Sequence, residues 1–346
     1  MSPAVSIVVP IYNVGEYVRR CLDSLIGQSL ENIEIICVDD GSTDDGPDIV
    51  AQYAARDRRV IALRQPKQGV SAARNAALAR ASGRYLVSVD ADDWLETAAC
   101  AQSARLLDSD PELDYVAWGS RIVYSGDPPP SADQFEAQYQ VKYEGRTAVT
   151  GEVRLNTVAN VCNKMLRMEP IRRFNILFSN HPVGEDGGFW YKFAAHARFG
   201  HYLDEPFYNY YRGRGDSATG GRTVLPDLNW LTIFEDIHAH YARHGQLDEV
   251  ERAFLARVFL NLYFADLHQA RDRRVVRNKA AALATALDLS NLDGDIIKAL
   301  KAGRDHEWGG YSLAEKIFSI KNRDRIRVIT LLGLEIKFAR KKRRQG

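Results

Sequence analysis

The amino-acid sequence predicts an α/β fold with a doubly wound, mainly parallel sheet of Rossmann-like type. Short apolar runs alternate with segments of helical periodicity through residues 1–100. Turn residues separate these segments, as at Pro10 after the first apolar run and at Gly83 before the last. Strands that alternate with helices in this way usually pair in parallel, with the helices covering the sheet.

Four strands are expected in this region, and each is a short, mostly apolar run: Val5–Val9, Ile33–Val38, Val60–Leu63 and Tyr85–Val89. Residues 17–25 carry apolar side chains at helical spacing, and the Ala-rich segment Val70–Ala81 is also expected to be helical. Ser42 and Thr43 are expected to cap a helix between the second and third strands, with Pro47 in its first turn.

Beyond Thr97 the pattern of strands and helices becomes less regular. Residues 160–211 mix short apolar runs with glycine and aromatic residues. From residue 225 to residue 300 the apolar side chains recur at helical spacing, for example at Trp230 and Ile233. The sequence therefore predicts a helical region in the C-terminal part of the chain.

The composition fits a globular protein that is neither strongly basic nor strongly acidic. The chain has 346 residues, of which 45% are hydrophobic, and a net charge of +1. This composition allows a large buried core. The charge is uneven, because residues 321–346 contain ten Lys or Arg and two acidic residues and so carry +8, which leaves −7 for the rest.

The cysteines and the N-terminus predict a cytoplasmic protein. Cys21, Cys37, Cys100 and Cys162 have no metal-ligand spacing and do not form a disulfide scaffold, so reduced thiols are expected. Met1–Pro3 leads directly into an apolar run and lacks the layout of a signal peptide. No apolar run approaches the roughly 20 residues that span a bilayer, so any membrane contact is expected to be peripheral.

Polar residues follow three of the four predicted strands. Pro10–Asn13 come after the first strand, Asp39–Ser42 after the second and Asp90–Asp93 after the fourth. Ligands of an open parallel sheet bind beyond the carboxyl ends of its strands, so these segments are expected to meet at one edge. Such an acidic edge would repel a bare phosphate but attract a hard divalent cation.

The acidic edge is expected to bind a diphosphate through a metal ion. Mg²⁺ takes one or two carboxylates together with substrate phosphate oxygens, and the metal stabilises diphosphate as a leaving group. Asp90 and Asp92 could divide the work, one facing a ribose and the other the metal. Asp39 could accept a hydrogen bond from a base or ribose, and Arg74 could offset the negative charge. For each motif alone, an ordinary turn, helix cap or solvated loop is the alternative.

Several segments resemble the family 2 glycosyltransferases of the GT-A fold, of the type that builds bacterial surface polysaccharides. The strong resemblance lies in Val5–Asn13, Cys37–Asp44, Gly69–Asn75 and Ser88–Trp94, and a weaker one continues through Asn163-Lys164 and Gly184–Phe189. The order and spacing of these segments make the resemblance specific. It implies a GT-A fold and a transfer of sugar from a nucleotide-sugar, with UDP as the expected nucleotide.

The resemblance also implies roles for single residues. Asp39 is expected near the nucleobase, Asp90 near the ribose and diphosphate, and Asp92 on a Mn²⁺ or Mg²⁺ ion, with Asp90 as a second metal ligand. The expected donor-binding residues are Pro10, Tyr12, Asn13, Asp39, Arg74, Asp90, Ala91 and Arg212. Asp186 stands where the family places its general base.

An inverting transfer needs one base to take the proton of the acceptor hydroxyl, and no second carboxylate as nucleophile. Asp186 is expected to be this base and its neighbour Glu185 is the alternative, although two acids after a glycine also favour a helix N-terminus. Residues Asn209–Thr219 resemble the family segment that closes over the donor. Arg212 or Arg214 in it could bind diphosphate, and a solvated surface position is the alternative.

Other nucleotide-binding classes lack support in this sequence. The turn after the first strand has no Gly-rich dinucleotide fingerprint, and neither a phosphate loop nor the basic Gly-rich loop of sugar nucleotidyltransferases is present. The Gln-x-x-Arg-Trp segment and membrane helices of processive synthases are also missing. Transfer of one hexosyl or N-acetylhexosaminyl unit to a glycan or lipid-linked acceptor is therefore expected. A catalytically degenerate nucleotide- or carbohydrate-binding module is the alternative.

We expect four parts in the chain: a nucleotide-sugar-binding half (1–100), an acceptor-binding and catalytic half (101–224), a helical region (225–305) and a basic, apolar tail (306–346). In the tail, apolar residues precede Arg340–Arg344, which suits the surface of an anionic membrane. The protein is thus expected at the inner face of the plasma membrane, and nucleic acid is not an expected partner. The alternation in Arg325–Ile329 also fits a strand or hairpin on the core.

Overall fold

A computed structural model describes most of the chain. The described residues are 2–124, 137–139, 142–181, 183–212 and 228–286, with the backbone of 318–323, 326–331 and 334–339. The chain divides into two compact units. The first comprises Met1–Thr150, Ala159–Asn180 and Glu185–Gly221, and the second comprises Gly151–Val158, His181–Gly184 and Arg222–Gly346.

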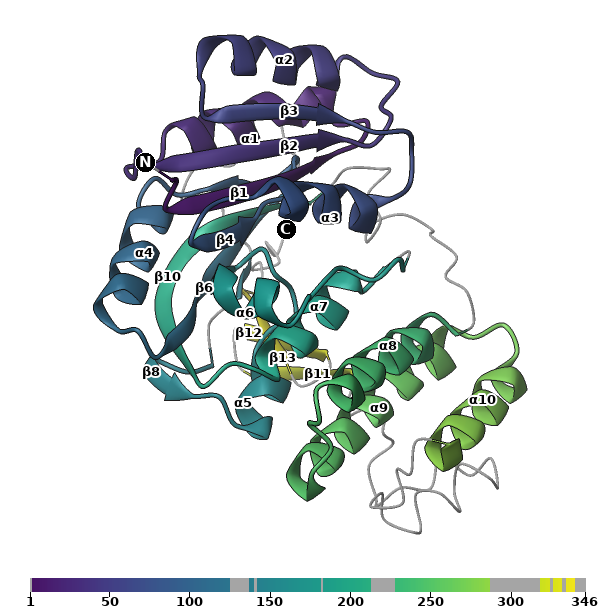
Figure 1. Cartoon of the computed structure of the whole chain (residues 1–346). Coiled ribbons are helices and arrows are strands. Elements are labelled where there is room, and N and C mark those ends of the chain that lie inside the picture. The colour runs from purple at the N-terminus through teal and green to yellow at the C-terminus, as the bar shows by residue number, and fades with distance from the viewer. Residues whose placement is uncertain are drawn as a thin grey trace, which may run out of the picture. The chain divides into compact units, whose positions relative to one another are not determined.

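The first unit is built on a parallel sheet, and all four predicted strands are confirmed with small differences at their ends. They are β1 (Val5–Ile11), β2 (Ile33–Asp39), β3 (Val60–Arg64) and β4 (Tyr85–Ser88), in the spatial order β4-β1-β2-β3 (Figure 1). Every residue of β2 is buried, because helices cover both faces of the sheet. Ile11 lies opposite Asp39, so β1 and β2 end at the same edge.

Helices connect these strands, and their faces follow from the strand order. They are α1 (Gly15–Ile26), α2 (Gly46–Arg56) and α3 (Val70–Arg80). Strands β1, β2 and β3 advance in one direction, whereas the chain returns past β1 to form β4. With right-handed crossovers, α1 and α2 therefore share one face and α3 covers the other.

The expected cap of α2 by Ser42 and Thr43 is wrong. The helix begins at Gly46, three or more residues later, and the Ser42 hydroxyl instead accepts a hydrogen bond from the Asn13 amide at 3.0 Å. The Asp44 carboxylate accepts from the Gly46 amide at 3.1 Å and from the Gly15 amide at 2.7 Å. One side chain thus binds the first residues of both α1 and α2, which fixes the loops at the carboxyl edge.

The less regular middle of the sequence extends the sheet with long strands that were not predicted individually. These are β6 (Leu113–Tyr124) and β10 (Phe199–Arg212), which pair in parallel, and the shorter strands β5 (Trp94–Leu95), β7 (Ala137–Tyr139), β8 (Gly145–Ala148) and β9 (Lys164–Arg167). Strand β9 is antiparallel to both β4 and β6. Helices α4 (Ala99–Ser109), α6 (Met168–Arg173) and α7 (Glu185–Ala194) complete this unit. The result is a mixed α/β fold with a mostly parallel sheet.

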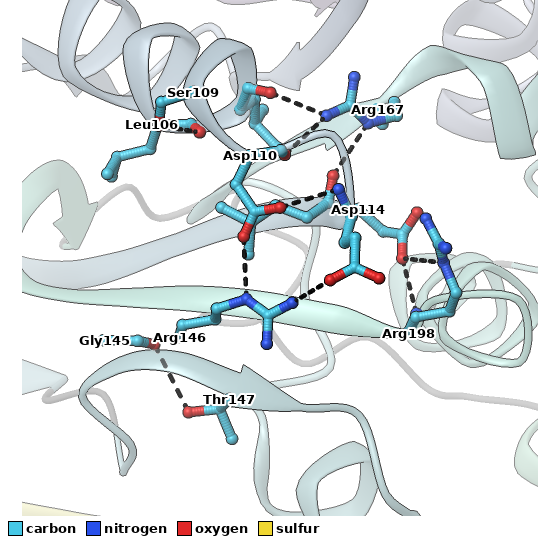
Figure 2. Close-up of polar contacts among 12 residues, drawn as sticks. Leu106, Ser109, Asp110, Asp114, Gly145, Arg146, Thr147, Arg167 and Arg198 are labelled. Atoms are coloured by element: carbon cyan, nitrogen blue, oxygen red, sulfur yellow. Dashed lines mark hydrogen bonds and ion pairs between the residues drawn. The ribbon is translucent and has the colours of Figure 1, made fainter.

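Arginine side chains bind the amino end of β6 to its neighbours, as Figure 2 shows. Arg146 on β8 places Nε 2.9 Å from Asp110 Oδ2, and Arg167 on β9 donates from Nε to the Leu113 carbonyl at 2.9 Å. Asp114 accepts a hydrogen bond from the Arg198 amide at 2.6 Å, just before β10 begins. These contacts hold three segments that are distant in sequence against one end of β6.

The second unit contains α5 (Gly151–Asn156), which was not predicted, and the predicted C-terminal helices α8 (Asn229–Arg243), α9 (Glu249–Gln269) and α10 (Arg273–Ala286). Asp248 caps α9 by accepting from the Glu251 amide at 2.8 Å, and Asp266 accepts from the Leu231 amide at 2.8 Å at the start of α8. In the described part of the chain, no helix has the length and apolar character needed to cross a bilayer.

The described parts of the tail are three antiparallel strands, β11 (Phe318–Arg323), β12 (Ile326–Leu331) and β13 (Leu334–Ala339). Strand β12 agrees with the strand or hairpin alternative that the alternating residues indicated. Arg325 and the basic cluster Arg340–Arg344 lie outside the described residues.

Candidate active site

The carboxyl ends of the central strands bring the predicted site segments together. Pro10 lies opposite Val38 near the ends of β1 and β2, and Ser88 at the end of β4 pairs with Val8. The polar segments 10–13, 39–42 and 90–93 therefore leave adjacent strands at one edge, as the sequence predicts. This edge holds the residues described below.

Arg74 on α3 connects carboxylates from two distant parts of the chain. Its Nη2 lies 2.7 Å from Asp90 Oδ1, and its Nη1 lies 2.6 Å from Glu185 Oε1 and 2.9 Å from Asp186 Oδ1. The arginine side chain is only 3% exposed, whereas Asp90 is 35% and Asp186 is 20% exposed. The sequence placed Arg74 beside the acidic edge, but nothing in it indicated the ion pairs with α7.

The arginine is positioned by an unusual backbone turn. Gly69, just before α3, has φ of +98°, a conformation that side chains on L-residues disfavour. Its amide donates to Asp40 Oδ2 at 2.7 Å, and the Gln68 amide donates to Asp40 Oδ1 at 2.8 Å. The Asp40 carboxylate therefore fixes the start of α3 relative to the end of β2.

Burial, together with the charges around it, shifts the pKa of Asp186. Burial raises the pKa of this carboxyl to about 7, Arg74 opposes the rise, and the nearby carboxylates of Glu185 and Asp90 add to it. One guanidinium faces three carboxylates, so the cluster has an excess of acidic groups. A carboxyl group with a pKa near neutrality is suited to accept a proton at physiological pH.

Asp93 anchors the turn that carries Asp90 and Asp92. Its carboxylate is buried and accepts hydrogen bonds from the Tyr208 hydroxyl and, at 2.7 Å, from the Tyr211 amide of β10. Burial, with the neighbouring Asp92 and Asp90, holds the pKa of Asp93 well above its usual range. Sequence reasoning missed this anchor, since Tyr208 lies on a strand more than a hundred residues away.

Arg20 on α1 makes a second contact with the 90–93 turn. Arg20 donates from Nη2 to the Asp92 carbonyl at 3.0 Å. Its guanidinium lies over the rings of Trp94 and Tyr211, at 3.9 and 4.5 Å from their centroids. The 90–93 turn is thus held by contacts from both α1 and β10.

The end of β2 presents one buried carboxylate with spare hydrogen-bonding capacity. Asp39 Oδ1 accepts from the Ser42 amide at 2.9 Å, while Oδ2 lies 3.1 Å from the exposed Arg64 Nε and accepts no other hydrogen bond from the described residues. Nearby, the Lys67 ammonium lies 3.8 Å from the centroid of the half-exposed Tyr12 ring and donates to its hydroxyl.

The other residues predicted to bind the nucleotide-sugar donor have different surroundings. Ala91 is buried within the 90–93 turn, and Asn13 holds the loop by accepting a hydrogen bond from the Thr43 amide at 2.9 Å. Arg212 is the last residue of β10, with its guanidinium 5.5 Å from the Tyr210 ring. Arg214 lies outside the described residues.

The residues before β9 form a further contact that was not predicted. The Val161 amide donates to the Asp186 carboxylate, and Cys162 Sγ lies 3.7 Å from Asp90 Oδ2. The four cysteines are buried free thiols. The weak resemblance at Asn163-Lys164 was the one signal in the sequence that pointed to this segment.

The donor atoms at the 90–93 turn are chemically suited to a divalent cation. Asp90 is partly exposed, and Asp92 follows two residues later on the same turn. Within the described ranges, no group of three or more His, Cys, Asp or Glu side chains is arranged as a metal site. A cation there would complete its coordination with phosphate oxygens and water, as Mg²⁺ often does. The metal assignment stays a prediction.

Comparisons with known proteins agree with this architecture. Residues 6–198 match the family described as glycosyl transferase family 2. EpsH of Bacillus subtilis is 33% identical over 214 residues, which are 60% of this chain and 61% of that protein. The chain thus spans about three fifths of EpsH, and it matches other curated relatives over smaller shares of their length.

Solved structures of TarS show the same fold. TarS 1–349 of S. aureus in complex with UDP-GlcNAc matches with a TM-score of 0.64 and 19% identity, covering 96% of this chain and 98% of that one. A mannosyltransferase of Pyrobaculum calidifontis in complex with GDP-Man and Mn²⁺ matches with a TM-score of 0.49 and 16% identity, covering 90% and 89%. The second similarity is too low to bear on a metal in this chain.

Proposed function

Because the chain belongs to glycosyl transferase family 2, we propose that it transfers one sugar from a UDP-sugar to a hydroxyl group of a glycan or lipid-linked acceptor, with inversion at the anomeric carbon. One observation carries this proposal. Asp90, at the end of a central strand, and Asp186, at the start of α7, bind the same buried guanidinium of Arg74. A donor-side and an acceptor-side carboxylate are thereby held at one edge of the sheet.

Asp186 is the proposed general base. An inverting transfer needs one group that takes the acceptor proton while the hydroxyl attacks the anomeric carbon. Burial raises the pKa of Asp186 to about 7, so the carboxylate is basic enough to take that proton and is still largely ionised above neutrality. Glu185, which is 11% exposed, is less accessible than Asp186, which is 20% exposed, and we assign it to holding Arg74.

Asp39 is the proposed contact of the nucleobase. A uracil ring carries an N3–H donor, and Asp39 Oδ2 has capacity for one more hydrogen bond. The buried position of this carboxylate would make a ring that lacks the donor costly to bind. The TarS structure with UDP-GlcNAc supports a uridine nucleotide and a hexosyl or N-acetylhexosaminyl unit for this chain.

Asp90 and Asp92 would hold a Mn²⁺ or Mg²⁺ ion, and Arg212 would add positive charge near the donor diphosphate. When bound, such an ion would supply positive charge that offsets the negative charge of a leaving diphosphate. Arg74 keeps Asp90 in place through its Oδ1 atom, while the tyrosine contacts of Asp93 hold the turn. The residues around the turn thus restrict its movement before any donor arrives.

The proposed setting is the synthesis of a bacterial surface polysaccharide at the inner face of the plasma membrane. A lipid-linked acceptor would lie at that membrane surface, and the basic residues 340–344 would hold the enzyme there. Sedimentation with anionic vesicles tests this for the full chain and a chain ending at Ala339. Binding by the full chain alone at low salt supports the proposal, whereas equal binding or no binding contradicts it.

The transferase activity is tested with a panel of donors. The full chain is incubated with Mn²⁺ or Mg²⁺ and each common nucleotide-sugar, and nucleotide release is measured. Release from UDP-sugars that requires the metal and is lost in Asp186→Asn supports the proposal. Tight binding of a nucleotide-sugar with no release under any condition would instead identify a degenerate binding module.

A further inference from the structure

Lys164, the first residue of β9, has a fully buried ammonium group. Its relative exposure is 0%, and burial lowers the pKa of its side chain to about 7. The ammonium donates to the Asn160 carbonyl at 2.7 Å and to Asn163 Oδ1 at 2.6 Å, and it lies 4.7 Å from the centroid of the Trp190 ring. The transferase chemistry proposed above has no use for this lysine, although burying it is energetically unfavourable.

The lysine closes a turn formed by residues 160–163, and this 160–163 turn touches two of the site carboxylates. Its Val161 amide donates to the Asp186 carboxylate, and its Cys162 Sγ lies 3.7 Å from Asp90 Oδ2. Asn163 anchors the turn to β6, where its Nδ2 donates to the Trp118 carbonyl at 3.2 Å and its carbonyl accepts from the Trp118 amide at 3.1 Å. The turn therefore links the sheet to the proposed base.

We propose that Lys164 is a positioning residue for Asp186, which it orients by holding the 160–163 turn so that the Val161 amide lies against the carboxylate. The inference rests on the proposed function, because it assigns Asp186 as the base. Without the ammonium, Asn160 and Asn163 would each lose a buried hydrogen-bond donor, and the turn would lose the contacts that fix its closure.

The electrostatic surroundings support the same role. The groups that face Asp186 are Arg74 from α3, Glu185 from α7, Asp90 beyond β4, and Cys162 and Lys164 around β9. Arg74 is already shared among three carboxylates. When its amine is protonated, Lys164 contributes a second positive charge within the electrostatic reach of Asp186.

The test replaces Lys164 by Met, which keeps the apolar stem and removes the ammonium. The matched control is Lys192→Met, since Lys192 is also buried and donates to the Leu177 carbonyl at 2.7 Å and to Ser179 Oγ at 2.8 Å, away from the 160–163 turn. We expect Lys164→Met to lower kcat by at least about tenfold with little change in donor KM. The control should retain kcat to within about threefold.

An activity-independent measurement separates this inference from the proposed function. The full chain is labelled with ¹³C at aspartate carboxyl groups, the Asp186 signal is assigned with Asp186→Asn, and its titration is followed by NMR. Lys164→Met should raise the titration midpoint of Asp186, because a positive charge and an oriented amide donor are lost, whereas Lys192→Met should leave it unchanged.

An unchanged Asp186 midpoint in Lys164→Met, or an equal loss of kcat in both variants, would overturn the positioning role. If the wild-type chain releases nucleotide from no donor, the proposed function fails, and the NMR titration still decides the role of Lys164. If Lys164→Met does not fold, Lys164→Gln, which keeps one hydrogen-bond donor, takes its place with the same two outcomes.

Discussion

The pKa of a buried carboxyl group is shifted in opposite directions at the two ends of the parallel strands. At the amino end, Glu34 accepts hydrogen bonds from the Ser6 hydroxyl at 2.6 Å and the Ser82 amide at 2.6 Å. Burial acts to raise the pKa of Glu34, but these hydrogen bonds outweigh it and the pKa is lowered. At the carboxyl end, burial prevails and the pKa of Asp186 is raised to about 7. The fold therefore lowers the pKa of a buried acid at one end and raises the pKa of another at the opposite end.

The largest expected effect comes from the 90–93 turn, the proposed metal site at the carboxyl end. Asp92→Ala should abolish transfer, because the leaving diphosphate would lose its counter-charge. Circular dichroism should show an intact fold, since Asp93, which the variant retains, makes anchoring contacts to β10. Nucleotide release is measured with and without a chelator. Full activity of the variant, or no effect of the chelator, would remove the metal from the proposal.

The next effect separates the two neighbouring acids of α7. Asp186→Asn should lower kcat by about a hundredfold or more, because an amide cannot accept the proton, while donor binding is retained. Donor titration and initial rates are measured in parallel, with Glu185→Gln as the matched variant. A loss of rate only in Glu185→Gln would move the base by one residue, and weak donor binding in Asp186→Asn would indicate a structural role.

The pH dependence of the rate should report the raised pKa of Asp186. The base acts only when ionised, so kcat/KM should fall by about tenfold per pH unit below the pKa, which is about 7, and level off above it. The profile is measured from about pH 5 to about pH 9, a range that includes the expected acidic limb. An acidic limb near the usual pKa of an exposed aspartate would contradict the comparison between the two ends.

At the amino end the expected effect is on stability and not on activity. Glu34→Gln should lower the free energy of unfolding by about 1–3 kcal/mol near neutral pH, because it weakens buried, charge-assisted hydrogen bonds. The lowered pKa of Glu34 makes this contribution complete above its ordinary value of 4.5, and it is lost as the pH falls through the folded-state pKa. Urea unfolding at neutral and acidic pH measures the difference. A loss of kcat in Glu34→Gln as large as that expected for Asp186→Asn would contradict the distinction between the two ends of the strands.

The smallest effect is expected from the surface pairs that Figure 2 shows. Arg146 is 42% exposed and binds Asp110 and Glu112, so Arg146→Gln should cost only about 0.2–1 kcal/mol of stability. Thermal melting at low and high salt provides the measurement. A loss comparable with that of Glu34→Gln would show that the arginine contacts at the start of β6 matter more than their exposure implies.

Local sequence patterns were enough to predict the parallel core and the segments that follow its strands. The four apolar runs became β1 to β4, and the acidic segments after β2 and β4 lie at one edge, because strand formation and the direction of a parallel sheet follow from local patterns. Local patterns were less reliable for predicting which side chain caps a helix. The cap expected from Ser42 was wrong, because that hydroxyl binds the end of β1 and Asp44 serves the helix starts.

Which distant side chains meet at that edge could not be predicted from local patterns, because it depends on how the elements pack. Arg74 and Glu185 are 111 residues apart, and Tyr208 and Asp93 are 115 residues apart, so no local pattern relates either pair. The same holds for Lys164, whose side chain became buried only when β9 paired between β4 and β6. Burial and the arrangement of charges set the pKa of Asp186, and both arise from packing between elements that the chain brings together only when it folds.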